Sequence, residues 1–111
     1  MAIAAISISP VGVGVSVSSY VAAAIAVLEA QDRVRWRLDS MFTTLEGEPA
    51  DLFAVIAKMQ EAVFAAGALR VGTVIKMDER RDREAHMEDK VRAVEEALEH
   101  RRPRPDRGPA R

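Results

Sequence analysis

Hydroxyl side chains recur on two predicted strands of this 111-residue chain. Ser7 and Ser9 alternate with isoleucines in the first apolar segment, and Thr43 and Thr44 lie in a later segment, close to Glu46. Hydroxyls in the middle of a covered sheet need hydrogen-bond partners. Two interpretations stay open. These groups bond within the protein or to a second subunit over the sheet, which is the commoner outcome, or they line a small pocket and orient a polar ligand.

Catalytic chemistry has little support in the residue types. The chain has no cysteine, which excludes disulfides, thiolate metal sites and cysteine nucleophiles. Its two histidines, His86 and His100, lack partners at the spacing of a catalytic triad or a histidine metal site. His86 with Asp82 or Asp89 could take a metal, but a solvated histidine at a helix end is the commoner outcome. We therefore predict a protein that is not an enzyme and needs no metal or catalytic cofactor.

Nucleotides and nucleic acids are also poor candidates for partners. Gly12 and Gly14 follow a predicted strand, but Val17 occupies the place of the third glycine in a dinucleotide-binding turn. RNA-recognition modules stack bases on aromatic side chains of their central strands, and Phe42 is the one aromatic residue that these strands offer here. Residues 1–99 carry a net charge of −5, which disfavours contact with phosphates. We predict no nucleic-acid partner.

The elements that must position these residues follow from the apolar periodicity. Alternation predicts strands over residues 2–9, 34–38, 41–46 and 69–77. Spacings of three and four predict a helix capped by Ser18 or Ser19, a helix from Pro49 that Gly67 terminates, and a helix that begins at Met87. This order predicts an α+β, ferredoxin-like βαββαβ sandwich with an added C-terminal helix. Its four-stranded antiparallel sheet has two helices on one face and the first strand between the third and the fourth.

The two ends of the chain differ in composition. Residues 100–111 hold five arginines, one aspartate and three prolines, which predicts a disordered basic tail after a ligand-binding domain over residues 1–99. Met1 to Leu28 contains no charge, but it lacks the basic start of a secretory signal and any run of about 20 apolar residues. We therefore expect a cytoplasmic protein that does not insert into a membrane.

Several segments resemble the thiamine-binding protein family, long catalogued as a domain of unknown function. They are the uncharged start, TTLEGE (43–48), KMQEAVFAAGALRV (58–71) and the most specific one, TVIKMDERRDREAHMEDKVRAVEE (73–96). The resemblance implies ferredoxin-like subunits that assemble as homodimers or homotetramers. It also implies a non-enzymatic, cytoplasmic binder of thiamine (vitamin B1) or its hydroxymethylpyrimidine half, supporting vitamin salvage or uptake. The alternative is a structural or regulatory oligomeric module with no small ligand.

Thiamine carries a cationic thiazolium and an aminopyrimidine, so its site needs hydroxyls, an apolar or aromatic wall and preferably a carboxylate. The residues predicted to bind this ligand are Ser7, Ser9, Phe42, Thr43, Thr44 and Glu46. Trp36 is the other candidate for the wall, although its alternation with Val34 and Leu38 favours a place in the core. Phe42 stands where the resemblance implies a small residue, so its ring is expected to alter the pocket.

Overall fold

The computed structural model describes residues 1–102, which form four strands and three helices. In chain order these are β1 (Ala2–Pro10), α1 (Ser18–Glu29), β2 (Arg35–Leu38), β3 (Thr43–Gly47), α2 (Pro49–Ala65), β4 (Val71–Glu79) and α3 (Met87–Arg101). The predicted order of elements is confirmed. The strand boundaries differ most at β3, which begins at residue 43, and at β4, which covers residues 71–79.

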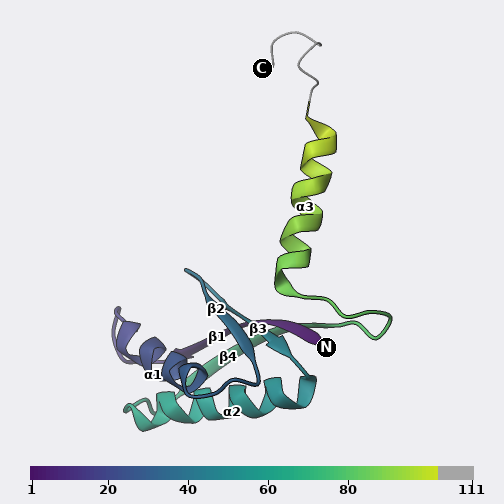
Figure 1. Ribbon diagram of the computed structural model, residues 1–111. Helices are drawn as coiled ribbons and strands as arrows, with labels where there is room; N and C mark the ends of the chain where they lie inside the picture. The colour runs from purple at the N-terminus through teal and green to yellow at the C-terminus, as the bar shows by residue number, and fades with distance from the viewer. Residues whose placement is uncertain (103–111) are drawn as a thin grey trace.

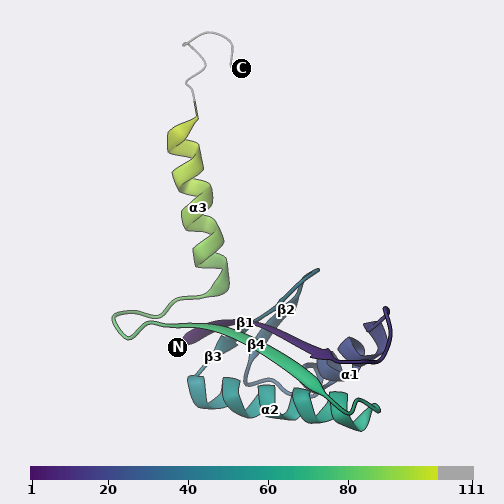
Figure 2. The same ribbon diagram turned by 180° about the vertical axis from the view of Figure 1, so that it is seen from behind.

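The four strands form one antiparallel sheet in the order β2-β3-β1-β4 (Figure 1). β1 lies between β3 and β4, as predicted, and pairs with β4 along its whole length, from Ala2↔Glu79 to Pro10↔Val71. Its pairing with β3 is shorter and ends at Ile6↔Thr43. α1 and α2 lie together against one face of the sheet, which confirms the ferredoxin-like sandwich (Figure 2).

The alternation along β1 decides which of its side chains the helices cover. Those buried beneath α1 and α2 are Ala2, Ala4, Ile6 and Ile8. The helices complete this core with fully buried residues at helical spacing, which include Leu28 of α1 and Leu52 and Val63 of α2. Burial of one such large apolar side chain contributes about 1.5–3 kcal/mol to folding. The core therefore fixes the face of β1 that carries Ile6 and Ile8, and leaves Ser7 and Ser9 on the other face.

α2 begins and ends where the sequence predicts. Pro49 is its first residue, where the missing amide hydrogen costs no helical bond. Gly67 follows the helix with φ +117°, a conformation that side chains disfavour. Its amide donates to the carbonyl of Phe64 (2.9 Å), and the Ala68 amide donates to the carbonyl of Val63 (3.4 Å). These two bonds form a Schellman motif, which satisfies the last carbonyls of the helix.

The start of α1 differs from the prediction that Ser18 or Ser19 caps it. Helix α1 begins at Ser18, Val17 holds the cap position, and no side chain caps the helix. The loop before it turns at Gly12 (φ +80°) and Gly14 (φ +105°), as expected for glycines in a tight turn. Because this loop places Val17 at the N-cap position, Ser18 and Ser19 lie within the first turn of the helix. A side chain at either position is beyond the place from which it could cap the helix.

α3 lies on the side of the sheet opposite to α1 and α2 and rises away from it (Figures 1 and 2). The predicted domain boundary after residue 99 falls inside this helix, which continues to Arg101. His100 and Arg101 suit the last turn because cations interact favourably with the carbonyl end of a helix. Residues 103–111 of the predicted tail lie outside the described residues. Within residues 1–102, no helix has the length and apolar character needed to cross a membrane.

Candidate ligand-binding site

A cavity of about 250 Å³ lies beside the half of β1 that β3 does not reach. Because the pairing with β3 ends at Ile6, the next residues of β1 have a neighbouring strand only on the β4 side. The connection from β2 to β3, residues 39–42, and helix α1 border the space that remains. Both faces of β1 line it, with Ile8 from the helix side and Ser7 and Ser9 from the other. The cavity thus lies within the layer of the sheet.

Four of the six predicted ligand-binding residues line this cavity. They are Ser7, Ser9, Phe42 and Thr43. The hydrogen bonds found within residues 1–102 include none from the hydroxyls of these serines or of Thr43. No buried side-chain polar atom of that part of the chain lacks a partner, so these hydroxyls are open to the cavity or to solvent. Three hydroxyls therefore remain available to a ligand.

Asp39 supplies the carboxylate of the cavity, and sequence analysis missed it. Its Oδ1 accepts a hydrogen bond from the Ser40 amide (2.7 Å), which fixes the carboxylate in the turn after β2. Asp39 and Ser40 both line the cavity. The available signal was the Asp-Ser pair between two strands, which is typical of a turn that brings its side chains to the end of a sheet.

The remaining wall of the cavity is apolar. Ile25 of α1 and Met59 of α2 line it from the helix layer, and Leu38 of β2 lines it together with Met41 and Phe42 of the β2–β3 connection. The last three side chains are exposed, which places apolar surface at the mouth of the cavity. Trp36, the other candidate for an aromatic wall, packs against the core instead. The cavity therefore combines hydroxyls, one carboxylate and one aromatic ring.

The other two predicted residues, Thr44 and Glu46, do not line this cavity. Ser7 and Ser9 line the cavity from the same face as Thr44, so the face alone does not exclude Thr44. Thr44 and Glu46 pair with the part of β1 that precedes the cavity. Thr43 is covered on the helix side, whereas Thr44 and Glu46 lie opposite Ala5 and Ile3 on the other face. The structure therefore separates the predicted set into two places.

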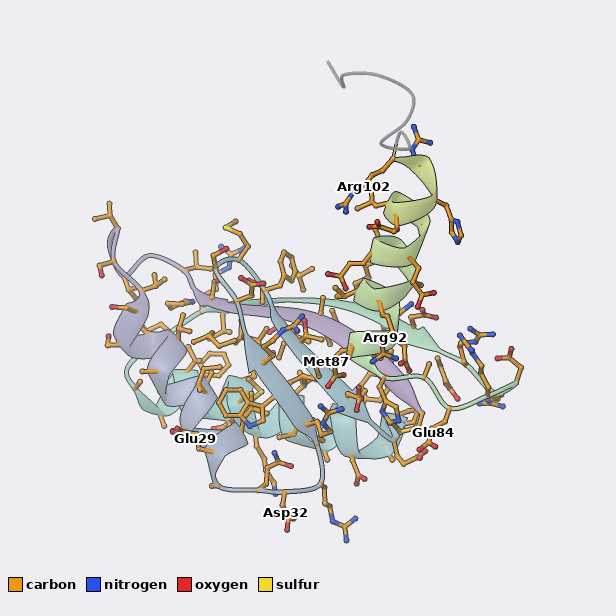
Figure 3. The ribbon with its side chains drawn as sticks, turned by 45° about the horizontal axis from the view of Figure 1, so that its top comes forward. Glu29, Asp32, Glu84, Met87, Arg92 and Arg102 are labelled. Atoms are coloured by element: carbon orange, nitrogen blue, oxygen red, sulfur yellow. The ribbon has the colours of Figure 1, made fainter. Side chains whose placement is uncertain are left out.

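Glu46 binds the first turn of α3. The Met87 amide donates to its Oε1 (2.6 Å), and Arg35 Nη1 donates to its Oε2 (2.7 Å). His86 Nδ1 lies 2.9 Å from the same Oε2. The Glu46 side chain is 1% exposed, although it lies on the face that α1 and α2 leave free. Figure 3 shows Met87 at the base of α3, where the helix meets the sheet.

Two further ion pairs join the same turn to the sheet. Arg35 pairs with Glu88, and Lys90 Nζ lies 2.5 Å from Asp78 Oδ2 of β4. The Asp89 carboxylate also accepts a hydrogen bond from the His86 amide (2.9 Å), which completes a capping box at the start of the helix. We refer to the contacts of Glu46, Arg35 and Asp78 with residues 86–90 as the α3 clamp.

The clamp shifts the acid–base equilibria of its members. Burial by itself would raise the pKa of Glu46, but the hydrogen bonds from His86, Met87 and Arg35 together lower that pKa below its ordinary value. The hydrogen bond to Glu46 raises the pKa of His86 above its ordinary value. Both shifts favour an ionised carboxylate beside a protonated imidazole. His86 is therefore a structural partner of Glu46. Among residues 1–102, no group of three or more acidic, histidine or cysteine side chains is arranged so that it could hold a metal ion.

A family model for thiamine-binding proteins matches residues 4–95, most of the chain. The chain belongs to the thiamine-binding protein family. A relative in this family, the UPF0045 protein YqgV of Bacillus subtilis, is 43% identical over 103 residues, which cover 89% of this chain and 99% of the relative. The UPF0045 protein of Methanothermobacter thermautotrophicus is 40% identical over 100 residues, covering 88% of this chain and all of the relative. These UPF0045 names state no activity.

Solved structures agree with the fold of this thiamine-binding family member. The hypothetical protein MJ1052 of Methanocaldococcus jannaschii superposes with a TM-score of 0.78 at 35% identity, covering 86% of this chain and 96% of that one. TM0486 of Thermotoga maritima, whose name refers to thiamine biosynthesis or salvage, superposes with a TM-score of 0.72. It is 16% identical and the match covers 84% of this chain and 97% of that one, so this likeness concerns the fold alone.

Proposed function

We propose that this protein binds thiamine or its hydroxymethylpyrimidine half in the cavity beside β1, without transforming it. Family membership supports a small-molecule ligand of this class. The observation that carries the proposal is the set of groups around the cavity: free hydroxyls, the Asp39 carboxylate and the Phe42 ring. An aminopyrimidine is flat and has donors and acceptors around its edge, so hydroxyls orient it while an aromatic ring stacks on its face.

The size and charge of the cavity favour one orientation of the ligand. Its volume of about 250 Å³ is below the roughly 300–1,000 Å³ of pockets that enclose drug-sized ligands. The pyrimidine half is therefore the part that we place inside, between Thr43 and Phe42. The cationic thiazolium of thiamine then lies at the mouth beside Asp39, where the opposite charge and the exposed apolar side chains favour it.

Binding without catalysis suits the residues of the cavity. Neither of the chain's two histidines lines it, and the chain has no cysteine. Asp39 is exposed, and its carboxylate accepts a hydrogen bond from the Ser40 amide. In this proposal thiamine is a bound ligand and not a catalytic cofactor, and the protein supports vitamin salvage or uptake in the cytoplasm.

Two adjacent threonines provide a matched test. Thr43→Val removes a hydroxyl from the cavity at nearly constant volume, and Thr44→Val removes one from the opposite face. Calorimetric titration with thiamine, its phosphates and hydroxymethylpyrimidine is expected to show binding that Thr43→Val weakens about tenfold and Thr44→Val leaves unchanged. Asp39→Asn is expected to weaken thiamine more than the uncharged pyrimidine. Absence of binding by the wild-type protein at millimolar ligand would overturn the proposal.

We also propose that the protein self-associates as a homodimer or homotetramer. The sheet face that α1 and α2 leave free, together with the exposed apolar side chains of α3, supports this proposal. The same surfaces favour the second candidate function, an oligomeric interaction module with no small ligand. That function predicts an oligomer whose mass and melting temperature do not respond to thiamine or its precursors.

A further inference from the structure

A second cavity, of about 320 Å³, lies in the helix layer between the end of α1 and the first half of α2. Its apolar wall consists of small aliphatic side chains from these two helices and from the segment before β2, namely Val27, Ala30, Val34, Ala54 and Val55. Glu29 and Asp32, labelled in Figure 3, mark the end of α1 and the turn that borders this cavity. Within residues 1–102 it shares no lining residue with the cavity beside β1. We refer to it as the α1–α2 cavity.

The turn that closes one side of the α1–α2 cavity is fixed by Gln31. Its Nε2 donates to the carbonyls of Leu28 (3.0 Å) and Val34 (2.9 Å), and its Oε1 accepts a hydrogen bond from the Val34 amide (2.8 Å). Val34 and Val55, which form the floor, are core residues that are 3% and 6% exposed. Because core residues and a hydrogen-bonded turn form the wall, no ligand is needed to shape it, and this lowers the cost of binding.

The charged residues of the lining carry a net positive charge. They are Arg33, Asp51 and Lys58. Arg33 Nη1 lies 3.5 Å from Asp51 Oδ1, so this carboxylate is already paired. The ion pairs found within residues 1–102 include none of Lys58. The nearby acidic residues Asp32 and Glu61 do not line the cavity. The lining therefore offers one unpaired cation to a ligand.

The two cavities of the chain present charges of opposite sign. The cavity beside β1 has the Asp39 carboxylate and, among residues 1–102, no cation in its lining. Residues 1–99 as a whole also carry a net charge of −5, so an apolar cavity with a positive rim is an exception in this chain. Complementary charge selects between ionic ligands. The α1–α2 cavity therefore favours an anion and disfavours the cationic thiazolium of thiamine.

The size and shape of the α1–α2 cavity restrict the apolar part of such an anion. An apolar cavity of about 150 Å³ holds one benzene molecule, so about 320 Å³ accommodates a larger apolar body together with a head group. Asp51 and Lys58 lie seven residues apart on α2, so the lining extends about 10 Å along the helix. Among residues 1–102, the lining contains no aromatic side chain on which a flat ring could stack. These features favour an aliphatic chain.

We propose that the α1–α2 cavity binds a small aliphatic carboxylate, with its chain against Val34 and Val55 and its carboxylate at Lys58. Arg33 is a second donor to this carboxylate, because its exposed ion pair with Asp51 contributes little stability and can be exchanged for the ligand. The site goes beyond the thiamine site and the self-association proposed above, since neither uses residues of this cavity.

Calorimetric titration with hexanoate and octanoate tests the apolar part of the ligand. Burial of two more methylene groups is expected to make octanoate bind about 15-fold more tightly than hexanoate. Octanol, which has the chain without the charge, is the control ligand for the variants below. Absence of binding by octanoate at millimolar concentration would overturn the proposal, as would equal affinities for the two carboxylates.

Two lysine substitutions test the charged part. Lys58→Gln removes the unpaired cation of the cavity and is expected to weaken octanoate about fivefold while leaving octanol unchanged. Lys76→Gln removes an equal charge from β4, outside the cavity, and is expected to leave both affinities unchanged. An equal loss of octanoate affinity in the two variants would assign the effect to net charge alone and refute a role for Lys58.

Two alanine substitutions on α2 test whether the ligand occupies the cavity. Ala54→Phe places a ring in the lining and is expected to abolish octanoate binding, whereas Ala57→Phe places the same ring on an exposed part of α2 outside the lining. Ala57→Phe is therefore expected to bind octanoate like the wild-type protein. Unchanged binding by a folded Ala54→Phe variant would place the ligand elsewhere and refute the assignment.

Methyl NMR of the wild-type protein locates the ligand without any substitution. Octanoate is expected to shift the methyl signals of Val27, Val34 and Val55, which line the cavity. Shifts confined to Val91 and Val94, which are exposed on α3, would show adsorption to apolar surface and overturn the proposal. These measurements use no thiamine, so failure of thiamine binding and failure of the carboxylate site are separately visible.

Discussion

Glu46→Gln tests whether one buried carboxylate holds α3 on the sheet. The Met87 amide donates to Glu46 Oε1 within a buried contact, and the substitution keeps the shape of the side chain while removing its charge. A hydrogen bond to a charged acceptor contributes about 1.5–3 kcal/mol, against about 0.5–1.5 kcal/mol for a neutral one, so the expected loss is about 1–1.5 kcal/mol. Arg35 and His86 are partly exposed, so solvent screens their ion pairs and they add less to this value than the buried contact does.

Hydrogen exchange at the Met87 amide measures this loss directly. Because α3 contacts the sheet only through its first turn, we expect a local opening of the helix rather than unfolding of the core. A loss of about 1–1.5 kcal/mol corresponds to about five- to twelvefold less protection at this amide. Amides of β1 are expected to keep their protection. Glu96→Gln, which neutralises an exposed carboxylate of the same helix, is the matched control.

Two outcomes would refute this reasoning. Unchanged protection of the Met87 amide in Glu46→Gln would mean that the charge of Glu46 does not stabilise the clamp. An equal loss in Glu96→Gln would assign the effect to the general charge of the helix and not to the buried contact.

The pH dependence of the clamp and the cap of α2 give two further predictions. The raised pKa of His86 means that its stabilising contribution is complete below the ordinary value of 6.5 and is lost as the pH rises through the shifted pKa. The lowered pKa of Glu46 means that its contribution is present above the ordinary value of 4.5 and is lost as the pH falls through the shifted pKa. Protection of the Met87 amide, corrected for intrinsic exchange, is therefore expected to be greatest between these values, and a flat profile would contradict the assignment. Gly67→Ala is expected to cost about 1–2 kcal/mol in urea unfolding because of its positive φ, whereas Gly72→Ala, with open space around the added carbon, is expected to cost much less.

The fold was predictable because its signals are local. Ser7 and Ser9 alternate with isoleucines that the helices bury, and Pro49 and Gly67 mark the two ends of α2. Boundaries were less predictable where a partner strand decides them. β4 extends to Glu79 because β1 pairs with it as far as Ala2, and no property of the acidic residues at its end indicates this.

The candidate site was only partly predictable, for a geometric and a topological reason. Thr43 and Thr44 are neighbours in sequence, yet the pleat of the strand sends them to opposite faces. Glu46 contacts His86, which lies 40 residues later in the chain. No local pattern of residues indicates a contact over such a separation. Asp39 was predictable as a site residue, because a turn between two strands brings its side chains to the same end of the sheet as Ser9.

β1 belongs to both proposed contacts of this protein, since Ser7 and Ser9 line the cavity beside it and also lie on the sheet face that α1 and α2 leave free for self-association. A ligand in that cavity and a second copy on that face would therefore act on the same few residues. Thermodynamic linkage requires that any factor by which assembly changes ligand affinity equals the factor by which the ligand changes assembly. Ligand affinity measured in dilute and in concentrated protein would then differ by that factor. At a fixed concentration of the vitamin, the fraction of protein with ligand bound would therefore change with the protein concentration.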